Sequence, residues 1–276
     1  MESADILTTL DEGVLTITLN RPQVYNALTM PMWRELRTLL EEGAMDPAVR
    51  VIVLTGAGKA FCTGADLQSF GTIDEGDELA VRNADNPVWM DVEMRVARLH
   101  RNAGICDLLH GMGKPTIAAV RGAVAGAGFS FAAACDFRVA SDTASFSGAY
   151  TRIGTSGDYG ISYFLTHLVG PSKARELLFL GDKVDAVTAL DIGLVGRVVP
   201  DGQLEDEVKA LATRLAAGPP VALRLMKQNL VAAETDHLRD VLELEGRNFI
   251  RTLQTDDSKE GMRAVQEKRP PEFKGR

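Results

Sequence analysis

The stretch KPTIAAVRGAVAGAGFSFAAACDFRVA, residues 114–140, combines a strand, a glycine turn, a helix and a second strand. The apolar run 114–120 is typical of a strand that a parallel sheet buries on both faces. The glycines in GAVAGAG allow another group to approach the backbone closely. Residues 137–140 are then expected to form a second strand. The order indicates a βαβ unit and therefore an α/β fold.

The rest of the chain extends this pattern. Residues 6–10 and 14–19 alternate around Asp-Glu-Gly and predict a hairpin, and Thr29 precedes a helix. The polar segment 71–87 lacks periodicity and is expected to be a mobile loop. Further elements are expected as strands at 51–56, 144–146 and 195–199, as helices at 89–109, 161–169, 203–217, 219–233 and 236–255, and as a charged tail from residue 267.

Composition excludes several classes of function. The net charge of −8 over 276 residues argues against a nucleic-acid partner. No apolar run is long enough for membrane insertion, and the N-terminus lacks a secretory pattern. Cys62, Cys106 and Cys135 lack the spacing of a metal site, so we expect no metal and interpret them as packed thiols in a reducing cytoplasm.

Two glycine-containing turns each follow a buried strand, AFCTGADL at 60–67 and GAVAGAG at 122–128. Each is expected to leave backbone N–H groups free at the start of a helix. Two such groups that converge would form an oxyanion hole for a carbonyl oxygen that becomes negative during a reaction. The alternative is a pair of tight turns whose small residues serve packing alone, and the residues by themselves leave both open.

Several further motifs carry a resemblance that runs almost end to end. They are LNRPQVYNALT (19–29), VIVLTGAGKAFCTGADL (51–67), residues 114–140, ELLFLGDKVDAVTALDIGLVGRVV (176–199) and EGMRAVQEKRPPEF (260–273). With them the sequence resembles the enoyl-CoA hydratase/isomerase (crotonase) superfamily. The resemblance implies an α/β crotonase-type spiral of ββα units with the active site in residues 1–200, and a helical oligomerisation region in 201–276. It also implies an acyl-CoA thioester substrate, a homo-trimer or dimer of trimers, and no cofactor besides the coenzyme A of the substrate.

The resemblance implies catalytic residues as well. The oxyanion hole would be the backbone N–H groups of Ala65 and Ala127. Enoyl-CoA hydratases carry two catalytic glutamates, and this chain has Ser130 and Tyr150 in their places. A serine is too weak a base, and a tyrosine is a neutral phenol near neutral pH. A hydratase of the two-glutamate type is therefore not expected.

Asp158, in GTSGDYGISYFL, is the expected replacement. Proteins similar to ring-1,2-epoxyphenylacetyl-CoA isomerase carry a proton-shuttling aspartate there, and 4-chlorobenzoyl-CoA dehalogenases carry a nucleophilic one. One carboxylate suffices to move a double bond from β,γ to α,β. The alternatives are an aspartate-dependent hydrolase or dehalogenase, a catalytically silent acyl-CoA-binding paralogue, and a plain N-cap for the helix that follows.

The remaining assignments concern the ligand. Tyr150, Tyr159, Phe129 and Phe131 are expected to line the acyl group, with core packing as the alternative for the two phenylalanines. Asp66 and Asp136 are interpreted as structural. By resemblance, the residues near the CoA moiety are Val24, Asn26, Ala27, Lys59, Ala60 and Phe61, with Lys268 as a phosphate contact that a neighbouring subunit donates.

Overall fold

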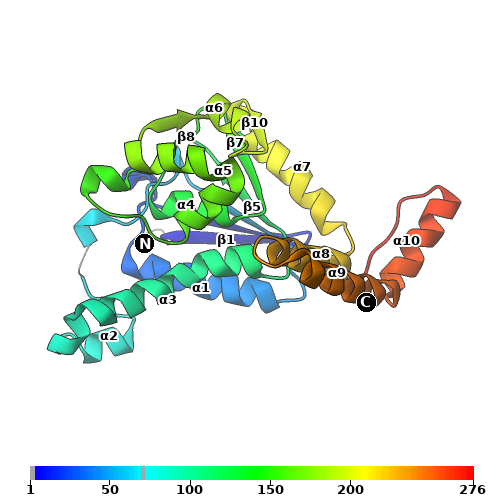
Figure 1. Ribbon diagram of the computed structural model, residues 1–276, viewed down its shortest axis with the longest axis horizontal. Helices are drawn as coiled ribbons and strands as arrows, with labels where there is room; N and C mark the ends of the chain where they lie inside the picture. Colours follow the sequence, from blue (N-terminus) through cyan, green and yellow to red (C-terminus); the bar gives the residue numbers. More distant parts are fainter. Residues whose placement is uncertain (1–3, 70–71) are drawn as a thin grey trace.

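The computed structural model describes residues 4–69 and 72–276, which form two sheets and the helices around them (Figure 1). The six-stranded sheet has the order β1 (Ile6–Asp11), β2 (Val14–Leu19), β3 (Val51–Gly56), β5 (Thr116–Val120), β7 (Phe137–Ser141) and β10 (Arg197–Val199). The four-stranded sheet has the order β4 (Ala60–Cys62), β6 (Ala123–Ala125), β8 (Ser145–Ser147) and β9 (Lys183–Asp185).

Successive strands alternate between the two sheets. β1 and β2 form the predicted antiparallel hairpin, with Ile6 opposite Leu19. From β2 onward the larger sheet is parallel, and β3, β5 and β7 are each followed by a strand of the smaller sheet. A helix then leads from each of β4 and β6 to the next strand of the larger sheet. This is the expected spiral of ββα units.

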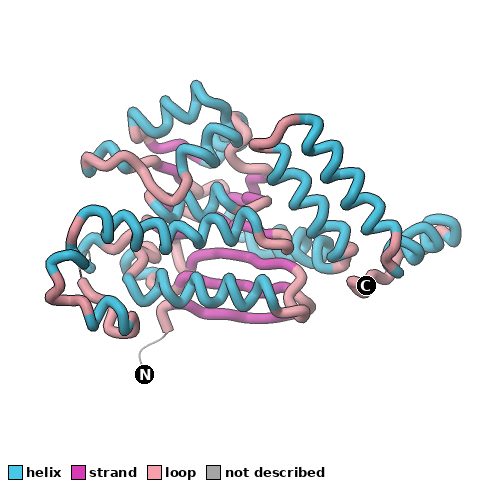
Figure 2. The backbone as a smooth tube through the Cα atoms, turned by 60° about the horizontal axis from the view of Figure 1, so that its bottom comes forward, coloured by secondary structure: helices cyan, strands magenta, loops and turns pink. Residues whose placement is uncertain are grey.

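The central strands β3 and β5 of the larger sheet are buried on both faces, as their continuous apolar sequences predict. Ile52 and Leu54 pack with α1 (Met30–Met45), α3 (Val92–Gly111) and α4 (Ala127–Ala134). Val51 and Val53 point the other way and pack on α7 (Leu204–Ala216). The magenta strands in Figure 2 lie side by side with helices around them. The proposed boundary at residue 200 stays a prediction, and α7 adjoins the sheet of the preceding region.

Of the segment 71–87, residue 71 lies outside the described residues, and residues 72–87 do not form the uniform loop that was expected. They contain the short helix α2 (Glu78–Arg82), whose first turn is capped by the Asp77 carboxylate. Helix α3 then begins at Val92 and not at Trp89, because Asp91 provides its N-cap and Trp89 lies in the preceding 3-10 turn. Local side-chain capping explains both differences.

Helix α5 (Ile161–Leu180) is interrupted at Gly170, where φ is 77°, so the helix expected over 161–169 ends at this kink and a second helical segment follows. The short strands β4, β6 and β9 and helix α10 (Asp256–Glu267) were not predicted. The remaining helices are α6 (Ala186–Asp191), α8 (Pro220–Ala233) and α9 (Leu238–Leu253). Figure 1 shows α10 at one end of the molecule and α2 at the other.

In the ranges that the structure describes, no helix has both the length and the apolar composition that a membrane span requires. Asp136 is structural, as expected. Its Oδ2 accepts hydrogen bonds from Thr116 N (2.7 Å) and Lys227 Nζ (2.8 Å), which ties α8 to the start of β5.

Candidate active site

The predicted site lies where three parallel strands end. β4, β6 and β8 pair in parallel, so their carboxyl ends meet at one edge of the smaller sheet. The segments that follow these ends carry Ala65, Ala127 and Tyr150 respectively. The carboxyl edge of parallel strands is where α/β folds bind ligands. The topology therefore gathers residues from three separate motifs.

The two glycine turns are in contact with each other. A Cβ on Gly64, whose φ is +91°, would lie 3.1 Å from Ala127 N. Leu28 pairs with the 64–66 backbone by donating to Gly64 O and accepting from Asp66 N, which leaves the intervening Ala65 amide outside this pairing. Within residues 4–69 and 72–276, neither Ala65 N nor Ala127 N donates a hydrogen bond. Two free N–H groups on touching turns are the parts from which an oxyanion hole is built.

The two turns differ in one respect from the expectation. α4 begins at Ala127 as predicted, whereas Ala65 is followed only by a three-residue 3-10 turn, Leu67–Ser69. The Asp66 carboxylate organises that turn by accepting from Gln68 N (3.0 Å) and from Arg21 Nη1 (2.9 Å). The bond from Arg21 is also the main cause that lowers the pKa of Asp66. Asp66 is therefore structural, as predicted.

Asp158, Ser130 and Tyr150 lie together beside α4. The Ser130 hydroxyl donates to the Asp158 carbonyl oxygen (3.2 Å) and lies 3.4 Å from the Tyr150 hydroxyl. Asp158 is half-buried, and its Oδ1 has no hydrogen-bond partner among the described residues. Ser130 and Tyr150 are buried. The structure thus joins the three side chains that the sequence proposed separately.

Burial sets the protonation behaviour of this cluster. Loss of solvent raises the pKa of Asp158, and a hydrogen bond from Tyr150 partly opposes the rise. Burial also raises the pKa of Tyr150, so its phenol stays protonated and acts as a donor. The arrangement is a carboxylate of raised basicity with a neutral donor next to it. Such a group is suited to accepting and returning a proton.

The N-cap alternative for Asp158 is wrong. α5 begins at Ile161, its N-cap is Gly160 with φ 75°, and no side chain caps it. Asp158 contributes only its carbonyl oxygen to this end, accepting from Ile161 N at 3.2 Å. Because the carboxylate takes no part in starting the helix, its position has no capping explanation.

The aromatic residues divide into two groups. Phe129 packs on Phe146 in the core, with ring centroids 5.5 Å apart. Phe131 and Tyr159 pack together with Trp33 of α1. Phe129 and Phe131 are 1% and 0% exposed, so core packing describes both. Trp33 lies in the helix that the sequence predicts after Thr29, and nothing in the sequence indicated its contact with Tyr159.

The segments expected near CoA also lie together. Asn26 is fully buried, and its Nδ2 donates to the carbonyl oxygens of Ala57 (3.0 Å), Ala60 (2.7 Å) and Phe61 (3.2 Å). The Asn26 side chain is thus occupied in holding the turn that leads to Ala65. Ala60 and Phe61 are buried as well.

The other predicted CoA contacts are on the surface. Val24 ends the 3-10 turn Pro22–Val24 and Ala27 donates its N–H to Val24 O, while Lys59 is exposed in the facing turn. Lys268 caps the C-terminal end of α10, far along the molecule from α4 (Figure 1). Within one chain, the structure therefore does not bring Lys268 to the other predicted residues.

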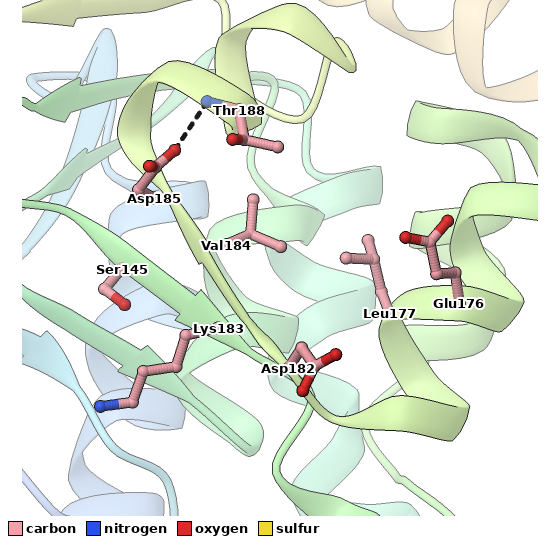
Figure 3. Close-up of a pocket in the computed structure, with 8 residues that line it drawn as sticks. All are labelled: Ser145, Glu176, Leu177, Asp182, Lys183, Val184, Asp185 and Thr188. Atoms are coloured by element: carbon pink, nitrogen blue, oxygen red, sulfur yellow. Dashed lines mark hydrogen bonds between the residues drawn. The ribbon is translucent and has the colours of Figure 1, made fainter.

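The three cysteines are packed thiols, and the described cavity lies apart from the predicted site. Cys62, Cys106 and Cys135 are free and buried, and burial raises the pKa of Cys62 and of Cys135 to about 12, which fits packed thiols. A cavity of about 290 Å³ between α5, β8, β9 and α6 shares no residue with the predicted site (Figure 3). Two of its three carboxylates have structural partners, since Asp185 caps α6 through Thr188 N and Glu176 pairs with Lys173.

Comparison with known proteins identifies relatives along the whole chain. The model of the enoyl-CoA hydratase/isomerase family matches residues 9–96 and 102–276. The chain is 35% identical to 1,2-epoxyphenylacetyl-CoA isomerase of Escherichia coli, over 98% of each chain. It is 30% identical to trans-2-decenoyl-(acyl-carrier-protein) isomerase of Streptococcus mutans, over 100% of each. The crystal structure of enoyl-CoA hydratase from Bacillus anthracis superposes with a TM-score of 0.87 at 31% identity, covering 99% of this chain and 100% of the other.

Proposed function

We propose that this chain, which belongs to the enoyl-CoA hydratase/isomerase family, moves the double bond of an enoyl-CoA thioester from the β,γ to the α,β position. The observation that carries the proposal is the position of Asp158. The main-chain oxygen of Asp158 accepts a hydrogen bond from Ser130 in α4, the helix whose N-terminal amide is free, and the residue carries a half-buried carboxyl group of raised pKa. This combination supplies a base and an anion-stabilising group to one substrate.

The reaction divides into two proton transfers. Asp158 takes the proton from Cα, and the electron pair of that C–H bond moves into the thioester, whose oxygen becomes negative. The N–H groups of Ala65 and Ala127 stabilise this oxygen, and each such donor contributes about 3 kcal/mol in known sites. The dienolate then collapses, the double bond forms between Cα and Cβ, and Asp158 returns the proton to Cγ.

The residues of the site favour isomerisation over hydration. Hydration by the two-glutamate route needs one carboxylate to activate water and another to protonate Cα, and the two corresponding positions hold Ser130 and Tyr150. Isomerisation needs one carboxylate only. The names of the relatives include both activities, since the Escherichia coli and Streptococcus mutans proteins are isomerases and the Bacillus anthracis protein is a hydratase, so the choice rests on the residues.

The binding scheme follows the resemblance. We assign the CoA moiety to the surface around Val24 and Lys59, whose two turns Asn26 holds together. Lys268 is assigned to a CoA phosphate of a neighbouring subunit in a trimer or dimer of trimers. The steps above use only groups of this chain and the thioester, so we propose that no further cofactor is required.

Transfer of an isotopic label tests the single-carboxylate shuttle. trans-3-Hexenoyl-CoA deuterated at Cα is incubated with the enzyme, and the 2-enoyl product is analysed by mass spectrometry and NMR. Because one carboxylate removes and returns the proton, deuterium is expected at Cγ of part of the product. A product without deuterium at Cγ, in which the transferred hydrogen comes entirely from solvent, would contradict the shuttle.

Substitution of Asp158 tests its role directly. Asp158→Asn is expected to lower kcat at least about 10³-fold, because the amide cannot accept the proton. Asp107→Asn, on the exposed face of α3, is the matched control and should keep wild-type activity. An Asp158→Asn enzyme with wild-type turnover would remove the proposal.

Two other outcomes select the alternatives. A covalent adduct on Asp158 after incubation with an aryl-CoA, without double-bond migration, would select the aspartate-dependent hydrolase or dehalogenase. Calorimetric binding of CoA esters without turnover of any member of a thioester panel would select a catalytically silent paralogue. Both experiments, the search for an adduct and the calorimetry, use the wild-type protein.

A further inference from the structure

The segment that carries Asp158 has an unusual backbone. Gly157, Tyr159 and Gly160 have φ of +91°, +54° and +75°, so three of four consecutive residues are left-handed. Glycine adopts this conformation freely, whereas for a bulky L-residue it costs about 1 kcal/mol or more. Tyr159 therefore needs an external contact that holds it. Strain of this kind concentrates at functional sites.

Three helices provide that contact. The Tyr159 ring stacks on Trp33 of α1, with centroids 4.8 Å apart and planes 13° apart. Phe131 of α4 meets the two rings edge-on, at 5.4 Å from Trp33 and 6.1 Å from Tyr159. Asn102 of α3 hydrogen-bonds the Tyr159 side chain. All three rings are less than 10% exposed.

The side chain of Asp158 has few bonds of its own. In the described part of the chain its Oδ1 has no hydrogen-bond partner, the Ser130 hydroxyl bonds the main-chain oxygen, and the carboxyl group interacts with the Tyr150 hydroxyl. The direction of the carboxylate therefore depends on that hydroxyl and on the backbone of residues 157–160. That backbone is fixed by the stacked ring of the next residue.

We propose that Trp33 is a positioning residue for catalysis, because its stack on Tyr159 holds the left-handed segment that aims Asp158 at the substrate. The inference rests on the proposed function for the role of Asp158 itself. Trp33 does not touch the reacting atoms in this scheme. Trp33 and Tyr159 are 126 residues apart in the sequence, and their rings are in contact.

A matched pair of substitutions tests the ring. Trp33→Phe keeps an aromatic face for Tyr159, and Trp33→Met keeps a flexible apolar side chain without a ring. For trans-3-hexenoyl-CoA, Trp33→Met is expected to lower kcat about 10–100-fold with KM within about threefold, since small displacements of a catalytic group have effects of this size. Trp33→Phe is expected to stay within about fivefold of wild type by the same argument.

A second comparison separates positioning from stability. Leu40 lies two turns further along the same helix and is fully buried, so Leu40→Ala destabilises α1 without altering the stack. Its kcat, measured where the variant is folded, should equal that of wild type. Equal losses of kcat in Leu40→Ala and Trp33→Met would overturn the inference, and so would wild-type kcat in Trp33→Met.

The double variant distinguishes this inference from the proposed function. If Trp33 acts through Asp158, adding Trp33→Met to Asp158→Asn lowers the residual kcat no further. Full additivity would overturn the positioning role while leaving the shuttle intact. Wild-type activity in Asp158→Asn alone would overturn the shuttle and the positioning role together.

Discussion

The negative charge of the half-buried Asp158 lowers the free energy of unfolding. Burial raises its pKa above that of the unfolded chain. A group with a raised folded pKa stabilises the fold fully below the unfolded pKa, and this contribution is lost as the pH rises through the folded value. Asp158 therefore makes the fold less stable at neutral pH than in acid. The same burial makes the carboxylate a stronger base.

Asp158→Asn should consequently be the more stable protein at neutral pH. The gain in the free energy of unfolding is expected to be below about 1 kcal/mol, because the half-buried group remains partly solvated. The difference should disappear as the pH falls below about 4, the ordinary aspartate pKa. Urea unfolding of both proteins between acid and neutral pH measures it, and an asparagine variant that is less stable at neutral pH would contradict the assignment.

The Tyr150 hydroxyl should tune the working pH. Its hydrogen bond favours the charged form of Asp158 and lowers the pKa of that carboxyl. kcat is expected to rise with pH as Asp158 ionises, and Tyr150→Phe should move the midpoint of that rise to higher pH. Tyr163→Phe is the control, because the Tyr163 hydroxyl donates to Glu234 (2.6 Å) outside the cluster. If Tyr150→Phe moved the midpoint of the kcat profile to lower pH, the proposed effect of the Tyr150 hydroxyl on Asp158 would be contradicted.

At the scale of elements, α4 offers a direct test of the oxyanion donor. Ala127 is the first residue of the helix, where proline is well tolerated, so Ala127→Pro removes the N–H without breaking the helix. Loss of one oxyanion donor typically lowers kcat about 10²–10³-fold. Ala127→Gly keeps the N–H and should keep activity. Equal kcat in the proline and glycine variants would exclude the amide from the reaction.

Elements with strong local patterns were predictable from the sequence. β3 and β5 are continuous apolar runs, and the start of α4 is set by its glycine turn. β9 was not predicted, because only Val184 of its three residues is buried and it pairs at the edge of the smaller sheet. α10 was missed because it buries few residues and has a mostly polar surface.

The candidate site was predictable only in part. The two turns follow from small residues after apolar strands, and Asp158 follows from a resemblance. Trp33 and Asn102 were not foreseen because they lie far away in sequence, on helices whose patterns predict ordinary packing. No repeat of fixed length was visible either, since the helix after β4 that leads to β5 has 20 residues and the one after β6 has eight.

At the scale of the whole molecule, α9 has an apolar stripe that the described residues of this chain leave exposed. Leu238, Leu242, Phe249 and Leu253 share one side of the helix by their spacing and are 74%, 57%, 63% and 42% exposed. Exposed stripes of this kind mark protein–protein contacts. The predicted trimer would cover such a surface with further copies of this chain.

Phe249→Glu should therefore weaken self-association. A buried, unpaired charge in a contact costs several kcal/mol, enough to shift the mass seen in sedimentation towards the monomer at micromolar concentration. Met45→Glu, at an exposed position at the end of α1, is the control and should leave the mass unchanged. A wild-type protein that sediments as a monomer would contradict the predicted assembly.

The alternation of strands between two sheets has a consequence for synthesis. β10 completes the edge beside β7, yet it begins 56 residues after β7 ends. Until residue 199 has left the ribosome, the N–H and C=O groups on that edge of β7 have no strand to pair with, and open edges recruit other chains. We therefore expect translation intermediates that stop short of β10 to aggregate, and a chaperone that binds the nascent chain to raise the soluble yield.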